Sequence, residues 1–159
     1  MAIYANEPIR YAGVSMVTAS LGTNDPEVGA RTTDAGSEYI FVYNAGNSII
    51  DVGMGAVLSG VSGYSVTVSA TTSNDFVIGI CQNGSIATGS YGWLLTRGFT
   101  QVEMDGTSGT VSKGGLIEIS DIGVWAPVSN TTGNNAPAQG KVMEAIVSAA
   151  SGTAYVSLF

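Results

Sequence analysis

The residues best suited to chemistry in this sequence are two pairs of closely spaced carboxylates. Glu103 and Asp105 form one pair, and Glu118 and Asp121 form the other. Two carboxyl groups that converge can act as general acid and general base, as they do in glycoside hydrolysis. However, the alternation of apolar and polar residues places Glu103 on the polar face of a strand, whereas Asp105 falls in a turn. We therefore expect solvated surface charges here rather than a catalytic pair.

The other common catalytic and metal-binding side chains are scarce. The chain has no histidine and one cysteine, so the usual Ser-His-Asp and Cys-His arrangements cannot be built, and zinc and iron sites lose their commonest ligand. Cys81 ends the apolar run FVIGIC, and the nearest basic residue in the sequence is Arg97. A thiol without a cationic neighbour is expected to be a buried, unreactive side chain. We therefore expect no enzyme activity, no cofactor and no bound metal.

Two tryptophans form the remaining candidate site. Trp93 and Trp125 could stack on a sugar, or they could form an aromatic interface with a partner protein. Aromatic residues in strands are also common in the core. The sequence leaves these alternatives open.

Composition and charge restrict the partners. The chain of 159 residues is long enough for one domain with a sizeable core, and it contains 22 glycines and only 11% charged residues. Five Lys and Arg residues oppose twelve Asp and Glu residues, which gives a net charge of −7. This charge repels phosphate backbones, so we expect no nucleic-acid partner. The sequence has neither a signal-peptide pattern nor a long apolar segment, so we expect no membrane partner.

Hydrophobic periodicity predicts an all-β fold. In YSVTVSA, residues 64–70, apolar and polar side chains alternate with the period of a half-buried strand. Asn83-Gly84 and Asp105-Gly106 are typical of tight hairpin turns, and residues 25–31 allow one short helix. Short strands separated by turns predict a compact barrel or sandwich. The expected strands are 38–44, 47–58, 64–70, 76–81, 92–97, 99–104, 116–120, 124–128, 141–147 and 154–159.

The first 37 residues differ from the rest of the chain because their apolar residues follow no sustained period. Ordering one residue costs about 1–2 kcal/mol of backbone entropy, and burying one apolar side chain returns about 1.5–3 kcal/mol. With apolar residues in the minority, burial alone does not order this segment. We therefore expect an extended N-terminal arm over 1–37 that forms contacts with another surface, for example by strand addition, and a β-domain over 38–159.

Several motifs in the β-domain together resemble a known family. They are VIGIC, GWLLTRGFTQVEMDGT, VSKGGLIEIS, GVWAPV and GKVMEAIVSAASGTAYVSLF. The chain resembles the decoration, or cement, proteins of tailed-bacteriophage heads, in which a similar hairpin and a KGDxL-like strand opening occur. It departs from them at Gly115, where an aspartate is common, and residues 1–37 have no counterpart.

This resemblance implies a β-barrel or β-tulip-like domain that forms a homotrimer. It further implies that the major capsid protein is the partner and that the outer capsid surface of the virion is the location, after synthesis in the host cytoplasm. The expected role is to stabilise the head against internal DNA pressure. On this hypothesis the arm contacts the capsid through Tyr4, Ile9, Arg10 and Tyr11. The alternative is a receptor-binding or carbohydrate-binding module of a tail fibre or baseplate, in which Trp93 and Trp125 contact the ligand.

Overall fold

The expected all-β fold is confirmed. The computed structural model describes residues 17–23, 25–59, 63–68, 77–106, 109–128 and 140–158. Nearly all regular structure in them is β, and no helix among them is long enough to cross a membrane. The elements are β1 (Val17–Thr18), β2 (Arg31–Asp34), β3 (Ser37–Asn44), β4 (Gly55–Leu58), β5 (Ser65–Thr67), β6 (Val77–Cys81), β7 (Tyr91–Glu103), β8 (Leu116–Ile119), the 3₁₀ turn η1 (Asp121–Gly123), β9 (Trp125–Pro127), β10 (Gly140–Val142) and β11 (Ser151–Ser157).

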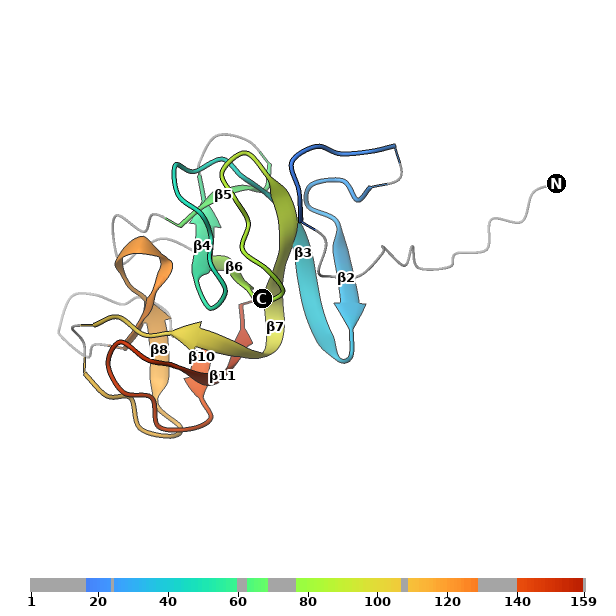
Figure 1. Ribbon diagram of the computed structural model, residues 1–159. Helices are drawn as coiled ribbons and strands as arrows, with labels where there is room; N and C mark the ends of the chain where they lie inside the picture. The colour runs from blue at the N-terminus through green and yellow to red at the C-terminus, as the bar shows by residue number, and fades with distance from the viewer. Residues whose placement is uncertain are drawn as a thin grey trace.

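Five strands close into a small barrel (Figure 1). The order around it is β3, β5, β4, β6 and β7, and β7 pairs with β3 to complete the ring. Only the pairing of β3 with β5 is parallel; the others are antiparallel. All five strands contribute to one core cluster inside the barrel: Ile40, Val42, Ile50, Ala56, Val66, Val68, Ile78, Cys81, Ile86 and Leu94.

A second sheet extends from the same strand β7. Its C-terminal half, from Arg97 to Glu103, pairs with β11, and the order continues through β10 and β8 to β9. β9 returns to the end of β7, where Trp125 forms a bridge with Met104 and the carbonyl of Trp125 accepts the N–H of Asp105 at 2.8 Å. The second sheet is therefore also nearly closed on itself, below the barrel in Figure 1.

The larger core cluster fills the space between the barrel wall and the second sheet. It combines barrel residues such as Phe41 and Leu95 with Val102, Ile117 and Trp125 from the second sheet. The indole N–H of Trp125 donates to the carbonyl of Gly53 at 2.9 Å. The two sheets thus share one core and form a single packed unit.

Strand β7 is continuous where the sequence predicted two strands, over 92–97 and 99–104. Gly98 lies inside the strand with φ of +139°, a conformation that side-chain-bearing residues rarely adopt. The pairing with β3 shifts register just before it, since Glu38 lies opposite Arg97 but Tyr39 lies opposite Leu95. This irregularity lets one strand change its partners from the barrel to the second sheet.

Three local expectations are wrong. Asp105-Gly106 does not join neighbouring strands, because β7 pairs with β11 rather than β8. Asn83-Gly84 belongs to a longer connection, from β6 to β7, in which Ile86 bridges Ile50. Residues 25–31 form no helix: they make one turn, in which the N–H of Ala30 donates to the carbonyl of Glu27 at 2.9 Å, and the N–H of Gly29 then donates to the carbonyl of Phe41 on β3 at 2.7 Å.

Part of the expected arm is paired with the β-domain of its own chain. Val17 and Thr18 pair with β7, and β2 pairs with β3 in a hairpin that spans the expected boundary between residues 37 and 38. Residues 1–16, with the four expected capsid anchors, lie outside the described residues. The contact role of that segment therefore remains a prediction.

The close approach of the two sheets can be tested at Gly55. A Cβ atom there would lie 2.7 Å from Ile119 Cδ1 and 3.0 Å from the Trp125 ring. We expect Gly55→Ala to lower the free energy of unfolding by about 1–3 kcal/mol, as overpacking does, in urea titrations followed by circular dichroism.

Gly106→Ala is the matched control. Its new Cβ would meet only Ala149 Cβ, at 3.8 Å, and the backbone of Gly106 is not in the left-handed region. We expect this variant to be as stable as the wild type or slightly more stable, because alanine restricts the unfolded chain. Equal losses of unfolding free energy in both variants would contradict the close packing around Gly55.

Candidate interaction surface

Four side chains form a row across the outer face of the second sheet. Phe99 on β7 lies opposite Tyr155 on β11, Tyr155 lies opposite Lys141 on β10, and Lys141 lies opposite Leu116 on β8. We call these four residues the outer row. Directly opposed residues in an antiparallel sheet point to the same face, so the outer row is one continuous strip of side chains.

The outer row is exposed because the strands alternate strictly here. Phe99 is 56% exposed and Leu116 is 49% exposed, whereas the neighbouring Thr100 and Ile117 point into the core. The rings of Phe99 and Tyr155 meet edge to face with centroids 5.1 Å apart. This geometry is favourable for aromatic pairs. The chain thus presents a preformed aromatic surface to its surroundings.

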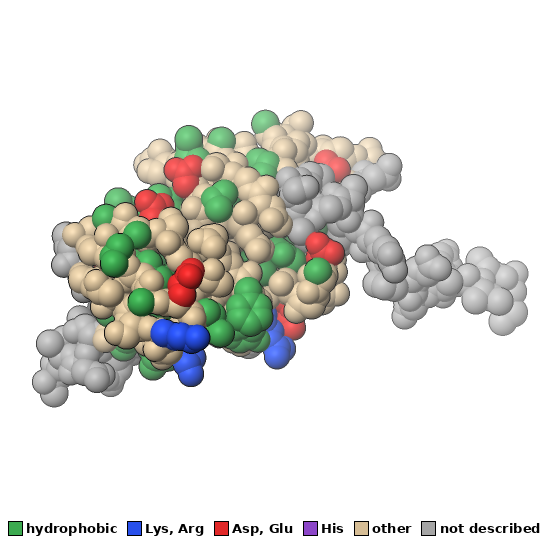
Figure 2. All heavy atoms as spheres, turned by 60° about the horizontal axis from the view of Figure 1, so that its bottom comes forward, with side chains coloured by type: hydrophobic (Ala, Val, Ile, Leu, Met, Phe, Trp, Pro, Cys, Tyr) green, Lys and Arg blue, Asp and Glu red, His purple; other side chains and the backbone are tan. Residues whose placement is uncertain are grey.

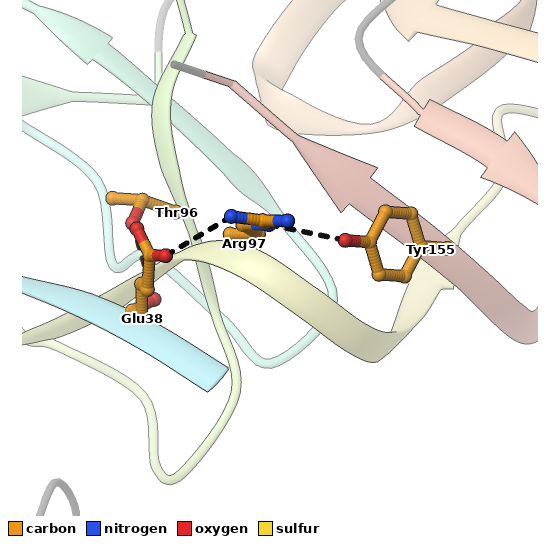
Figure 3. A network of polar contacts seen from close by, with 4 residues as sticks. All are labelled: Glu38, Thr96, Arg97 and Tyr155. Atoms are coloured by element: carbon orange, nitrogen blue, oxygen red, sulfur yellow. Dashed lines mark hydrogen bonds and ion pairs between the residues drawn. The ribbon is translucent and has the colours of Figure 1, made fainter. Parts of the chain in front are cut away.

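Arg97 organises the end of the outer row next to the barrel (Figure 3). Its Nε donates to the Tyr155 hydroxyl at 3.2 Å, and its Nη1 forms an ion pair with Glu38 Oε1 at 3.3 Å. The Tyr155 hydroxyl and then Glu38 raise the pKa of Arg97 above its ordinary value. Exposed ion pairs contribute little to stability, so the main effect of this network is to orient the Tyr155 ring.

Further polar contacts border Phe99 and Tyr155. Gln101 Nε2 donates to Thr153 Oγ1 at 3.2 Å, and Gln82 Nε2 donates to the carbonyl of Phe99 at 3.2 Å. Glu144 Oε1 accepts the backbone N–H of Thr153 at 2.8 Å, and this bond lowers the pKa of the Glu144 carboxyl. An apolar centre with a polar rim is typical of protein–protein interfaces.

Lys141 lies in the far part of the row, and Lys113 belongs to the turn beside it. A Cβ atom at Gly114 would be 3.7 Å from Lys141 Cε, so the Lys141 side chain lies against the turn that contains Lys113. Among the described residues, neither lysine forms an ion pair, since the pairing found there joins Arg97 and Glu38. Figure 2 shows Lys and Arg side chains along one border of the molecule, beside hydrophobic side chains and next to some of the Asp and Glu side chains.

The two tryptophans are part of the core instead. Trp93 is 4% exposed and packs on Phe41 with ring centroids 5.0 Å apart, and Trp125 is fully buried. Neither indole can stack on a sugar or contact a partner in this structure. The expectation of an exposed aromatic interface at Trp93 and Trp125 is therefore wrong. The accessible aromatic residues of the outer row are Phe99 and Tyr155.

The expected chemical role of Cys81 agrees with the structure. Its thiol is buried and donates to the carbonyl of Gly84 at 3.1 Å. Desolvation by burial raises the pKa of this thiol to about 12, so it stays protonated and unreactive at neutral pH. The described residues contain no group of acidic, Cys or His side chains placed to hold a metal ion.

The outer row was missed by reasoning from the sequence, although one signal for it existed. Phe99 is in phase with the polar residues Gln101 and Glu103, so the strand pattern already placed an aromatic ring on the wet face. Its neighbours Tyr155, Lys141 and Leu116 come from strands distant in the sequence. Only the pairing register brings the four together.

The fold resembles that of a known protein although the sequence does not. No protein-family model and no curated protein sequence matches this chain. The solved structure of the head fiber gp8.5 N base of bacteriophage phi29 is similar, with a TM-score of 0.53 and 12% sequence identity. The similarity covers 75% of this chain and 94% of that one. At this identity, the likeness establishes a shared fold.

The protected state of Cys81 leads to a chemical test. At pH 8, a thiol with a pKa of about 12 has a thiolate fraction of about one in 10,000, roughly a thousandfold below that of an ordinary cysteine. We expect an aromatic disulfide reagent to modify the native protein far more slowly than the urea-unfolded protein. Equal rates in both states would contradict the burial of this side chain.

The bond to Glu144 leads to a pH prediction. A carboxyl whose folded pKa is lowered adds stability above its unfolded pKa, and that stability is lost as the pH falls through the folded pKa. Because the Thr153 N–H lowers the pKa of Glu144, we expect Glu144→Gln to show a shallower loss of stability in acid than the wild type. Urea titrations between pH 6 and the acid limit of folding measure this slope; Glu103→Gln is the control, and an unchanged slope in Glu144→Gln would contradict the contact.

Proposed function

We propose that this protein is a structural component of a bacteriophage head, and specifically a decoration protein that binds the outer surface of the capsid. The observation that carries the proposal is the fold likeness, which covers almost the whole of the head fiber gp8.5 N base. The motifs that resemble head decoration proteins point the same way. The proposed partner is the major capsid protein, and the proposed assembly is a homotrimer.

Binding rather than catalysis explains how such a protein would act. A protein that binds only the intact shell stabilises it in proportion to occupancy. An oligomer that engages equivalent capsid sites gains affinity, because the later contacts form within one complex. The stiff double-sheet core and the preformed outer row reduce the ordering cost that such contacts would otherwise carry.

A second candidate is the base of a head appendage, and it follows from the description of the structural neighbour as a head fiber base. The sugar-binding alternative is weakened, because the tryptophans on which it relied are buried. Both candidates place the protein on the virion, but they differ in copy number. Decoration requires many copies over the shell, whereas an appendage base need not fill every equivalent position.

The test is to mix the purified protein with expanded phage heads that lack it, pellet the heads and count the bound copies. We expect saturation at a multiple of the capsid's threefold positions. Heads that already carry the protein are the control, since their sites are occupied. If the protein did not co-pellet with these heads, the proposal would be contradicted. Saturation at only a few copies per head would favour the appendage base.

A further inference from the structure

The exposed surface has a second unusual feature besides the outer row. Residues 49–52, between β3 and β4, expose Ile49 by 51% and Val52 by 43%, with the exposed carboxylate of Asp51 between them. We call this segment the acidic knuckle. It combines apolar contact area with one negative charge, which is the complement of the apolar and positively charged outer row.

The acidic knuckle is held rigidly. Ile50 is fully buried and forms a bridge with Ile86, with reciprocal backbone hydrogen bonds of 3.0 and 2.9 Å. The N–H of Met54 donates to the carbonyl of Asp51 at 3.0 Å, which closes the turn. A surface that keeps its shape when free loses little entropy on binding.

We propose that the outer row of one copy of this chain binds the acidic knuckle of a second copy. In this contact, Asp51 lies against Lys141, and the knuckle's Ile49 and Val52 pack against the apolar side chains of the row. Aromatic residues at the centre of an interface commonly contribute most of its binding energy. Phe99 supplies that contact area here, and Tyr155 is already oriented by Arg97.

Charge complementarity favours a second copy of the chain as the partner that binds the outer row. Lys141 and Lys113 have no ion-pair partner among the described residues, and they belong to a chain with a net charge of −7. A second copy of the chain carries the exposed carboxylate of Asp51 in its acidic knuckle, which can pair with Lys141. Opposite charges brought together across an interface favour association and its register.

The arrangement within one chain makes the proposed contact heterologous. The acidic knuckle adjoins Gly53, whose carbonyl accepts the N–H of Glu103 at the edge of β7, whereas Lys141 and Leu116 lie beyond β11 on the other side of β7. A chain therefore carries the two surfaces on opposite sides of one strand. Contacts between unlike surfaces are heterologous, and they close into a cyclic oligomer when the rotation allows it.

This inference deepens the proposed function, on which its biological setting rests, but its test needs no phage heads. The full chain is examined by sedimentation velocity from about 1 to 100 µM, the range in which contacts of moderate affinity form. We expect a concentration-dependent oligomer of the wild type. We expect Lys141→Glu, Asp51→Lys and Phe99→Ser each to weaken association by at least about tenfold.

The charge-swapped double variant, Lys141→Glu with Asp51→Lys, separates a direct contact from a general effect of charge. We expect it to regain the association that each single variant loses. Asp34→Lys is the matched control, because Asp34 is exposed on β2, outside both surfaces, and this variant should associate like the wild type. Circular dichroism and urea titration establish that each variant is folded.

Three outcomes would overturn the inference: a wild type that stays monomeric throughout, folded variants that associate normally, or a double variant that is no better than the single ones. A protein that associates as expected but does not bind heads would leave the inference standing and contradict the proposed function alone. Head binding by a strictly monomeric protein would overturn the inference and the proposed homotrimer, but it would leave the proposed capsid binding standing.

Discussion

Strand β7 is the constraint on which the rest of the structure depends, because it belongs to both sheets. Its first half is buried on both faces and pairs with β3 and β6, and its second half pairs with β11 and has one exposed face. The irregular pairing at Glu38 and the positive φ of Gly98 permit this change of partners. Barrel, shared core and outer row are all positioned relative to this one strand.

The sequence predicted the strands better than their connections. Alternation and apolar runs located β3, β6, β8 and β9 to within a residue or two, because burial of a strand face leaves a local pattern. Pairing leaves no such pattern: Asp105-Gly106 has the composition of a tight turn, but β7 finds its partner about fifty residues further along the chain. Residues 25–31 likewise form no helix, and the N–H of Gly29 bonds instead to the carbonyl of Phe41, a residue outside this segment.

The same difference between local sequence pattern and long-range strand pairing decided which residues of the candidate surface could be predicted. Trp93 and Trp125 were candidates because of their residue type. Large aromatic side chains also fill hydrophobic cores, and both tryptophans are buried in the shared core. Phe99 could have been placed on the exposed face from its phase along the strand. Its position beside Tyr155 and Lys141 could not have been predicted, because the two β-pairings that bring these residues together join distant parts of the chain.

The pairing of β7 with β11 also sets an order of events during synthesis. Phe99 emerges from the ribosome long before Tyr155, and the outer row exists only after β11 has docked on β7. The five barrel strands all precede residue 104, so they can close first. In a nascent chain the outer row therefore forms last, after β11 has been synthesised, so a contact that needs the outer row cannot form before folding is nearly complete.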